Sequence, residues 1–150
     1  MGVLINKKID SLLESTSRSF YPTLKYLPKK IRGQIGLLYL LARVADTIAD
    51  SKHGETEFLL EKLRKYNDVA QGRSTDLPDF SELADIQKNQ NEAELLRNVQ
   101  DVLAGLEVYD EADNQRILEC LDIIVAGQVL DLERFGPANE GDKISSLESN

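Results

Sequence analysis

Residues 35–50 read IGLLYLLARVADTIAD, and this stretch decides the fold. Its apolar residues are too dense for a strand that alternates between two faces, and they point in nearly every direction around a helix axis. A helix that is apolar all round is typical of a buried position. The apolar set is Leu37, Leu38, Leu40, Leu41, Val44 and Ile48.

Polar residues interrupt this helix at a regular spacing. Tyr39, Arg43, Asp46 and Asp50 follow one another at intervals of 4, 3 and 4 residues. At roughly 100° per residue, all of them fall within about 60° of arc, along a ridge on the order of 16 Å long. Buried charges are costly unless they are paired, hydrated or bound to metal. We therefore expect the ridge, defined by these residues, to line a cavity rather than to pack solidly.

The ridge alone supports two interpretations. Asp46 and Asp50 lie one turn apart, and two such carboxylates can share or bridge a hard divalent cation, which prefers oxygen ligands. Equally, Arg43 could form an ordinary ion pair with Asp46 or with a neighbouring helix, since ion pairs on helices are common. The spacing leaves both a metal-binding pair and a structural ion pair open.

Helical periodicity continues on both sides of this stretch, without convincing strand alternation. Gly54 and Gly72 mark breaks between helices, and Pro28 suits the first turn of the long helix. The pattern predicts an all-α fold. The helices are expected over residues 3–15, from Ser17 or Ser19 to 26, and over 28–50, 56–71, 80–87, 93–109 and 112–135.

The bulk composition excludes several classes of protein. The chain has 150 residues, 41% hydrophobic and 29% charged, which is enough for one domain with a core. Its net charge of −8, without a basic patch, argues against a nucleic-acid partner. The single cysteine, Cys120, excludes an internal disulfide framework, and its apolar neighbours predict that it is buried.

No signal-peptide pattern and no apolar run long enough to span a membrane occurs in the sequence. We therefore expect a cytoplasmic protein. Peripheral membrane association through apolar substrates stays open.

Two longer patterns surround the ridge. Ser17, Ser19 and Phe20 form a Ser-x-Ser-Phe segment, followed by the Tyr-x-x-x-Arg-x-x-Asp-x-x-x-Asp pattern of the ridge. Together they resemble the N-terminal signature of the squalene/phytoene synthase family. Residues 127–135, GQVLDLERF, resemble the Gly-Met-x-x-Asp-Leu-Glu stretch of the same family, with Gly127, Asp131 and Glu133 in place.

The resemblance implies an antiparallel helical bundle of the isoprenoid synthase type and a head-to-head condensation of two prenyl diphosphates. Farnesyl or geranylgeranyl diphosphate would be the substrate, and squalene- or phytoene-type compounds the product. Asp46 and Asp50 would bind Mg²⁺ against the diphosphate. The other implied roles are catalytic for Tyr39, Arg43 and Phe20, and substrate-binding for Ser17, Ser19, Arg43, Leu38 and Asp131.

The chain departs from the family pattern: no second Asp-x-x-x-Asp motif occurs in it, and the family's later helices, which would close the cavity, are missing. We therefore expect residues 1–150 to be the N-terminal part of a single isoprenoid-synthase-like domain, truncated at its C-terminus and catalytically incomplete. Apolar helix faces left uncovered would favour a homodimer. The other interpretation is a non-catalytic family member that acts as an interaction or assembly module. Substrate chain length and the use of NADPH stay open.

Overall fold

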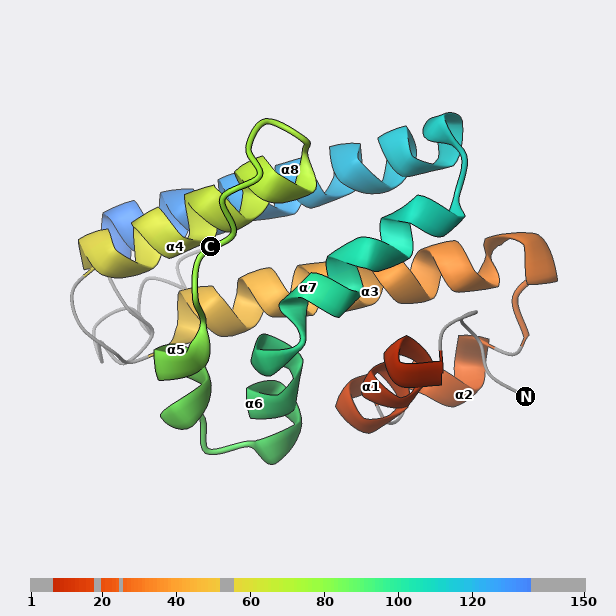
Figure 1. Cartoon of the computed structure of the whole chain (residues 1–150), viewed down its shortest axis with the longest axis horizontal. Coiled ribbons are helices and arrows are strands. Elements are labelled where there is room, and N and C mark those ends of the chain that lie inside the picture. Colours follow the sequence, from red (N-terminus) through yellow and green to blue (C-terminus); the bar gives the residue numbers. More distant parts are fainter. Residues whose placement is uncertain (1–6, 18–19, 25, 52–55, 136–150) are drawn as a thin grey trace.

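The computed structural model describes residues 7–17, 20–24, 26–51 and 56–135, and no strand occurs among them (Figure 1). The predicted all-α fold is confirmed. The elements, in chain order, are α1 (Lys7–Ser17), α2 (Phe20–Leu24), α3 (Lys29–Asp50), α4 (Thr56–Ala70), α5 (Ser81–Asp85), α6 (Gln90–Arg97), α7 (Val99–Ala104), the 3₁₀ turn η1 (Gly105–Val108) and α8 (Glu111–Phe135).

The long helices α3, α4 and α8 form the frame of the molecule. The Tyr66 hydroxyl of α4 donates to the Leu41 carbonyl of α3 at 2.8 Å. Just after α4, the Gln71 amide donates to the Leu118 carbonyl of α8, also at 2.8 Å. Since α4 runs antiparallel to both neighbours, α3 and α8 run side by side in the same direction (Figure 1).

One side of α3 forms the centre of the hydrophobic core. Leu40, Leu41 and Ile48 are fully buried, and each such side chain contributes on the order of 1.5–3 kcal/mol through burial. Tyr66 is buried against them, and this burial raises the pKa of its hydroxyl. Further core positions are Leu37, Val44 and Ala45 of α3, Leu59, Leu60 and Leu63 of α4, and Ile117, Leu121 and Val125 of α8.

The opposite side of α3 is not buried, and the expectation of a helix enclosed all round is wrong for the described residues. Leu38, Tyr39 and Arg43 are half-buried, while Asp46 and Asp50 are exposed. The reason is that α3 packs mainly against α4 and α8, leaving the ridge between α8 and α6. Charged residues can occupy this position without the full cost of desolvation.

The helix predicted over residues 93–109 is also wrong, because it breaks at Asn98. The Asn98 amide donates to the Glu94 carbonyl at 2.8 Å, and Asn98 itself has φ −121°. A side chain that bonds to the backbone one turn back competes with helix propagation. The chain therefore turns between α6 and α7.

Cys120 was predicted to be buried, and this prediction is wrong: the thiol is exposed. Ile117 and Leu121 face the core, whereas Cys120 lies about 100° around α8 from Leu121. Two other apolar side chains on this outer side, Ile123 at 73% and Leu130 at 46%, are also exposed.

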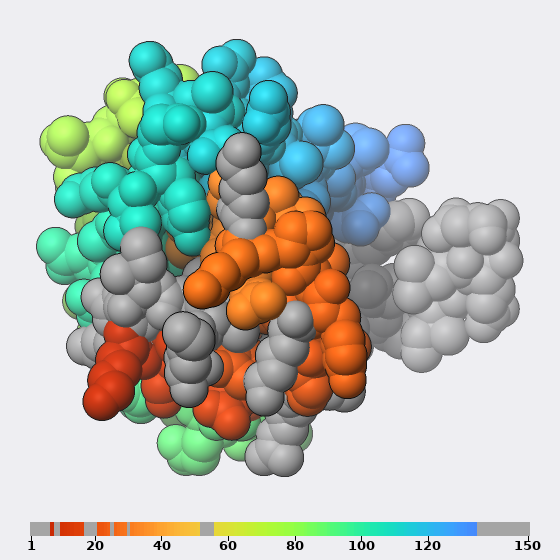
Figure 2. All heavy atoms as spheres, turned by 90° about the vertical axis from the view of Figure 1, so that its right-hand side faces the viewer, coloured from red at the N-terminus to blue at the C-terminus, as the bar shows by residue number. Residues whose placement is uncertain are grey.

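The N-terminal helices α1 and α2 cover one end of α3. Tyr21 of α2 donates to the Asp10 carboxylate of α1 at 2.9 Å, which joins the two short helices. Figure 2 views this end of the molecule, with the start of α3 near the centre and α1 and α2 below it. Within the described ranges, no helix is long and apolar enough to cross a membrane.

Candidate functional site

The ridge lies along one side of α3, as the spacing predicted. A regular helix from Lys29 to Asp50 brings Tyr39, Arg43, Asp46 and Asp50 onto one line. Glu92 of α6 flanks this line on one side, and Gln128 of α8 flanks it on the other. The ridge therefore lies between α6 and α8.

Arg43 is held at both ends of its guanidinium group. Its Nη2 donates to the Tyr39 hydroxyl at 2.6 Å, and its Nη1 donates to Glu92 Oε2 at 3.3 Å. The guanidinium also lies 5.5 Å from the centre of the Tyr39 ring, within cation–π range. The hydrogen bond to Tyr39 raises the pKa of Arg43, and the charge of Glu92 acts in the same direction. The ion pair of Arg43 thus runs to a neighbouring helix.

Asp46 faces α8. Its Oδ1 accepts a hydrogen bond of 3.1 Å from Nε2 of Gln128. Beside this contact lies an open pocket of about 180 Å³ between α3 and α8. The residues that line it are Tyr39, Ala42, Arg43, Asp46, Ile124 and Gln128, so one guanidinium and one carboxylate of the ridge share the same space.

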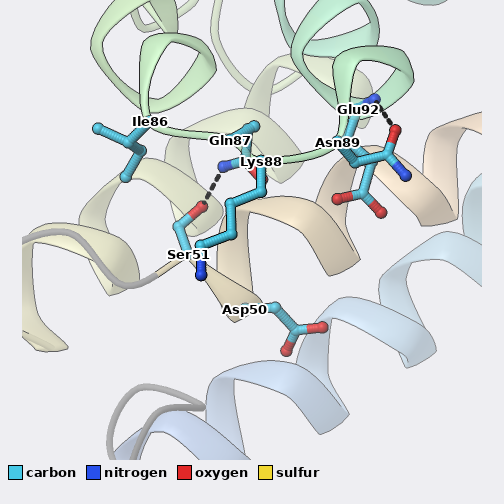
Figure 3. Close-up of a pocket in the computed structure, with 7 residues that line it drawn as sticks. All are labelled: Asp50, Ser51, Ile86, Gln87, Lys88, Asn89 and Glu92. Carbon is cyan, nitrogen blue, oxygen red and sulfur yellow. Dashed lines mark hydrogen bonds between the residues drawn. The ribbon is translucent and has the colours of Figure 1, made fainter.

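Asp50 lines a second pocket, of about 330 Å³, at the C-terminal end of α3 (Figure 3). Ser51 and Gln87 join its walls through a hydrogen bond of 2.9 Å. Figure 3 shows the Lys88 side chain reaching from the α5–α6 loop towards the end of α3, while the Asp50 side chain points away from that loop. Glu92 lines this pocket as well as binding Arg43, so the Arg43–Glu92 ion pair connects the two pockets.

Asp46 and Asp50 are the carboxylates that would hold a magnesium ion, and the ion would need further ligands of its own. Both are exposed, one turn apart and next to open pockets. Among the described residues, no group of three or more His, Cys, Asp or Glu side chains gathers around one point. Mg²⁺ commonly uses one or two carboxylates, completed by water and substrate phosphates, so two carboxylates on a ridge are a suitable donor set.

Comparison with known proteins shows the family. The family model for squalene/phytoene synthase matches residues 13–143, most of the chain. The chain belongs to the squalene/phytoene synthase family. Neither the curated proteins nor the solved structures contain a match to it.

The second family stretch of this squalene/phytoene synthase family member lies on α8, the helix that flanks the ridge on one side. Asp131 is exposed, and its spacing from Ile124 and Gln128 places it on the same side of α8 as those pocket residues. Glu133 instead faces α4, where it accepts from Arg64 at 2.7 Å. Of the two acidic residues, Asp131 is the one placed towards the ridge.

The structure describes the remaining predicted site residues only in part. Leu38 is half-buried against the core. Ser17 ends α1 and Phe20 begins α2, and the structure describes only their backbone. Ser19 lies outside the described residues. The predicted roles of these residues stay predictions.

Sequence reasoning missed Glu92, Ile124 and Gln128. Glu92 and Gln128 contact ridge residues that lie 49 and 82 positions away in the chain, so no local pattern indicates these contacts. One signal was available for Gln128, because it stands where the family stretch has methionine. A polar residue at a position that is usually apolar indicates a specific polar contact.

Proposed function

We propose that this chain binds the diphosphate group of a prenyl diphosphate on the ridge of α3, through Mg²⁺ at Asp46 and Asp50. In the complete reaction, this site would serve the head-to-head condensation of two farnesyl or geranylgeranyl diphosphates. The observation that carries the proposal is the division of charge along the ridge. A guanidinium held in place by Tyr39 and Glu92 lies one turn from the exposed carboxylate of Asp46 and two turns from that of Asp50.

The charges explain why a cation is needed. A diphosphate that approached Asp46 and Asp50 alone would meet like charge, and the chain as a whole carries −8. When bound, Mg²⁺ offsets the negative charge that develops on the diphosphate leaving group. Arg43 adds bidentate hydrogen bonds to the phosphate oxygens, for which a guanidinium is better suited than an ammonium group.

The size of the pocket indicates which part of the substrate it takes. The space beside Arg43 and Asp46 measures about 180 Å³. Pockets that enclose drug-sized ligands commonly measure about 300–1,000 Å³. This pocket therefore suits the diphosphate end of the substrate, and the chain length of the prenyl group stays open, as does the use of NADPH.

The test is calorimetric titration of the chain with inorganic diphosphate and with a farnesyl thiodiphosphate analogue, each with and without Mg²⁺. We expect binding only with Mg²⁺, and an increase in Kd of at least about tenfold, or about 1.4 kcal/mol, in Asp46→Ala and in Asp50→Ala. Asp76→Ala is the matched control, because Asp76 is exposed and lines neither pocket. Binding that ignores Mg²⁺ and both ridge substitutions would contradict the proposal.

A second candidate function is an interaction or assembly module. It is favoured by the outer side of α8, where Cys120, Ile123 and Leu130 are exposed in the described part of the chain. Such a face could associate with a second copy of the chain. The same titration separates the two functions, because an assembly module would self-associate without Mg²⁺-dependent binding of diphosphate.

A further inference from the structure

Gln128 makes a directional contact with the ridge. Its Nε2 donates to Asp46 Oδ1 at 3.1 Å, while its carbonyl oxygen is buried and has no hydrogen-bond partner in the described part of the chain. Turning the amide over would place its oxygen against the Asp46 carboxylate, where two acceptors would face each other. Among the described residues, Asp46 is thus the group that orients the amide.

The buried carbonyl oxygen of Gln128 lowers the stability of the fold. A buried acceptor without a partner destabilises the folded state, and an apolar side chain of similar length would avoid that cost. Methionine, which occupies this position in the family stretch, has such a shape and donates no hydrogen bond. Stability alone therefore favours an apolar residue over Gln128, and the contact with Asp46 needs another explanation.

We propose that Gln128 is a positioning residue for Asp46 in cation binding. The inference depends on the proposed function, because it takes Asp46 as a magnesium ligand. By holding Oδ1, the amide restricts rotation of the carboxylate and leaves Oδ2 for the cation. Hydrogen-bonding partners of metal ligands commonly change metal affinity by about 10–100-fold when they are removed. Because Gln128 also lines the pocket beside Arg43, it acts where the diphosphate is expected.

The test is Gln128→Met, measured by calorimetric titration with Mg²⁺ and inorganic diphosphate and by thermal unfolding. We expect the Kd for Mg²⁺-dependent binding of diphosphate to rise about tenfold while Tm stays the same or increases. Gln115→Met is the matched control, since Gln115 donates to the Glu119 carboxylate on the same helix at 3.2 Å and lines neither pocket. Its Kd should be unchanged.

A double substitution then tests whether Gln128 acts through Asp46. In the Asp46→Ala background, Gln128→Met should cause no further loss of affinity, because the positioned group is already gone. An unchanged Kd in Gln128→Met, or a fall in Tm that accompanies the loss of affinity, would overturn the positioning role. If Asp46→Ala abolishes binding while Gln128→Met has no effect, only this inference fails. If the unsubstituted chain binds no diphosphate with Mg²⁺, the proposed function fails too.

Discussion

The two halves of the ridge differ in how they are held. At Tyr39 and Arg43, the guanidinium is half-buried, bonded to a hydroxyl at 2.6 Å and to a carboxylate at 3.3 Å. At Asp46 and Asp50, the carboxylates are exposed and lie beside open pockets. The same helix thus presents a cation that is fixed before any ligand arrives and two anions that are accessible to a cation.

This difference suggests how the site would handle a charged ligand. Fixing Arg43 in advance reduces the conformational entropy that binding must remove from a long side chain. The carboxylates must instead stay accessible, since a hydrated Mg²⁺ must reach them with its waters. Substitutions in the Arg43 half therefore test whether its fixed geometry affects the ligand, beginning with the largest expected effect.

Arg43→Met should have the largest effect on diphosphate binding in this half. Hydrogen bonds to charged groups contribute about 1.5–3 kcal/mol, and methionine keeps much of the length of the side chain without the charge. We expect a loss of binding free energy of that size in calorimetric titration with Mg²⁺ and diphosphate. The control is Arg64→Met, which removes the exposed ion pair with Glu133 on α8. Equal losses in the two variants would show that Arg43 acts only through the overall charge.

Tyr39→Phe should have a smaller effect, on stability. The substitution removes the hydroxyl that accepts from Arg43 and keeps the ring 5.5 Å from the guanidinium. The free energy of unfolding should fall by about 0.5–1.5 kcal/mol in urea denaturation. Tyr26→Phe is the control, because Tyr26 is 89% exposed. No difference between the two variants would mean that the hydroxyl does not hold Arg43 in solution.

The long helices could be predicted well from the sequence, because local residues mark where they begin and end. Pro28 precedes α3, and Gly72 follows α4 with φ 84°, a left-handed conformation that glycine adopts readily. Arg73 then donates its backbone N–H to the Asp68 carbonyl at 2.8 Å, which completes a helix C-terminal cap. The break at Asn98 could not be predicted in this way, because Asn67 and Asn114 lie inside α4 and α8, which do not break.

The candidate site was predictable only along its own helix. The 4-3-4 spacing places the ridge residues on one line, since helix geometry alone determines that result. Which side of α3 is covered depends on how α4, α6 and α8 pack, and this is a tertiary property. Burial of the whole helix was therefore predicted wrongly, and the contacts of Glu92 and Gln128 were not predicted at all.

Glu92→Gln should have the smallest effect on diphosphate binding. Whether binding becomes tighter or weaker tells what the ion pair with Arg43 does. Glu92 pairs with Arg43 at 3.3 Å, with side chains that are 28% and 30% exposed. If Glu92 competes with the diphosphate for Arg43, the uncharged variant should bind diphosphate more tightly, by about 0.2–1 kcal/mol or up to about fivefold in Kd. Glutamine keeps the shape and can still contact Arg43 through its carbonyl oxygen.

Glu133→Gln is the matched control for this substitution, because Glu133 forms an exposed ion pair with Arg64 at 2.7 Å. It removes the same charge from the chain, so its effect on Kd measures the change in overall charge alone. Tighter binding only in Glu92→Gln would show that the ion pair holds Arg43 until the ligand replaces it. Weaker binding would show that Glu92 must remain charged to orient Arg43, and that the fixed half of the ridge depends on α6 as much as on α3.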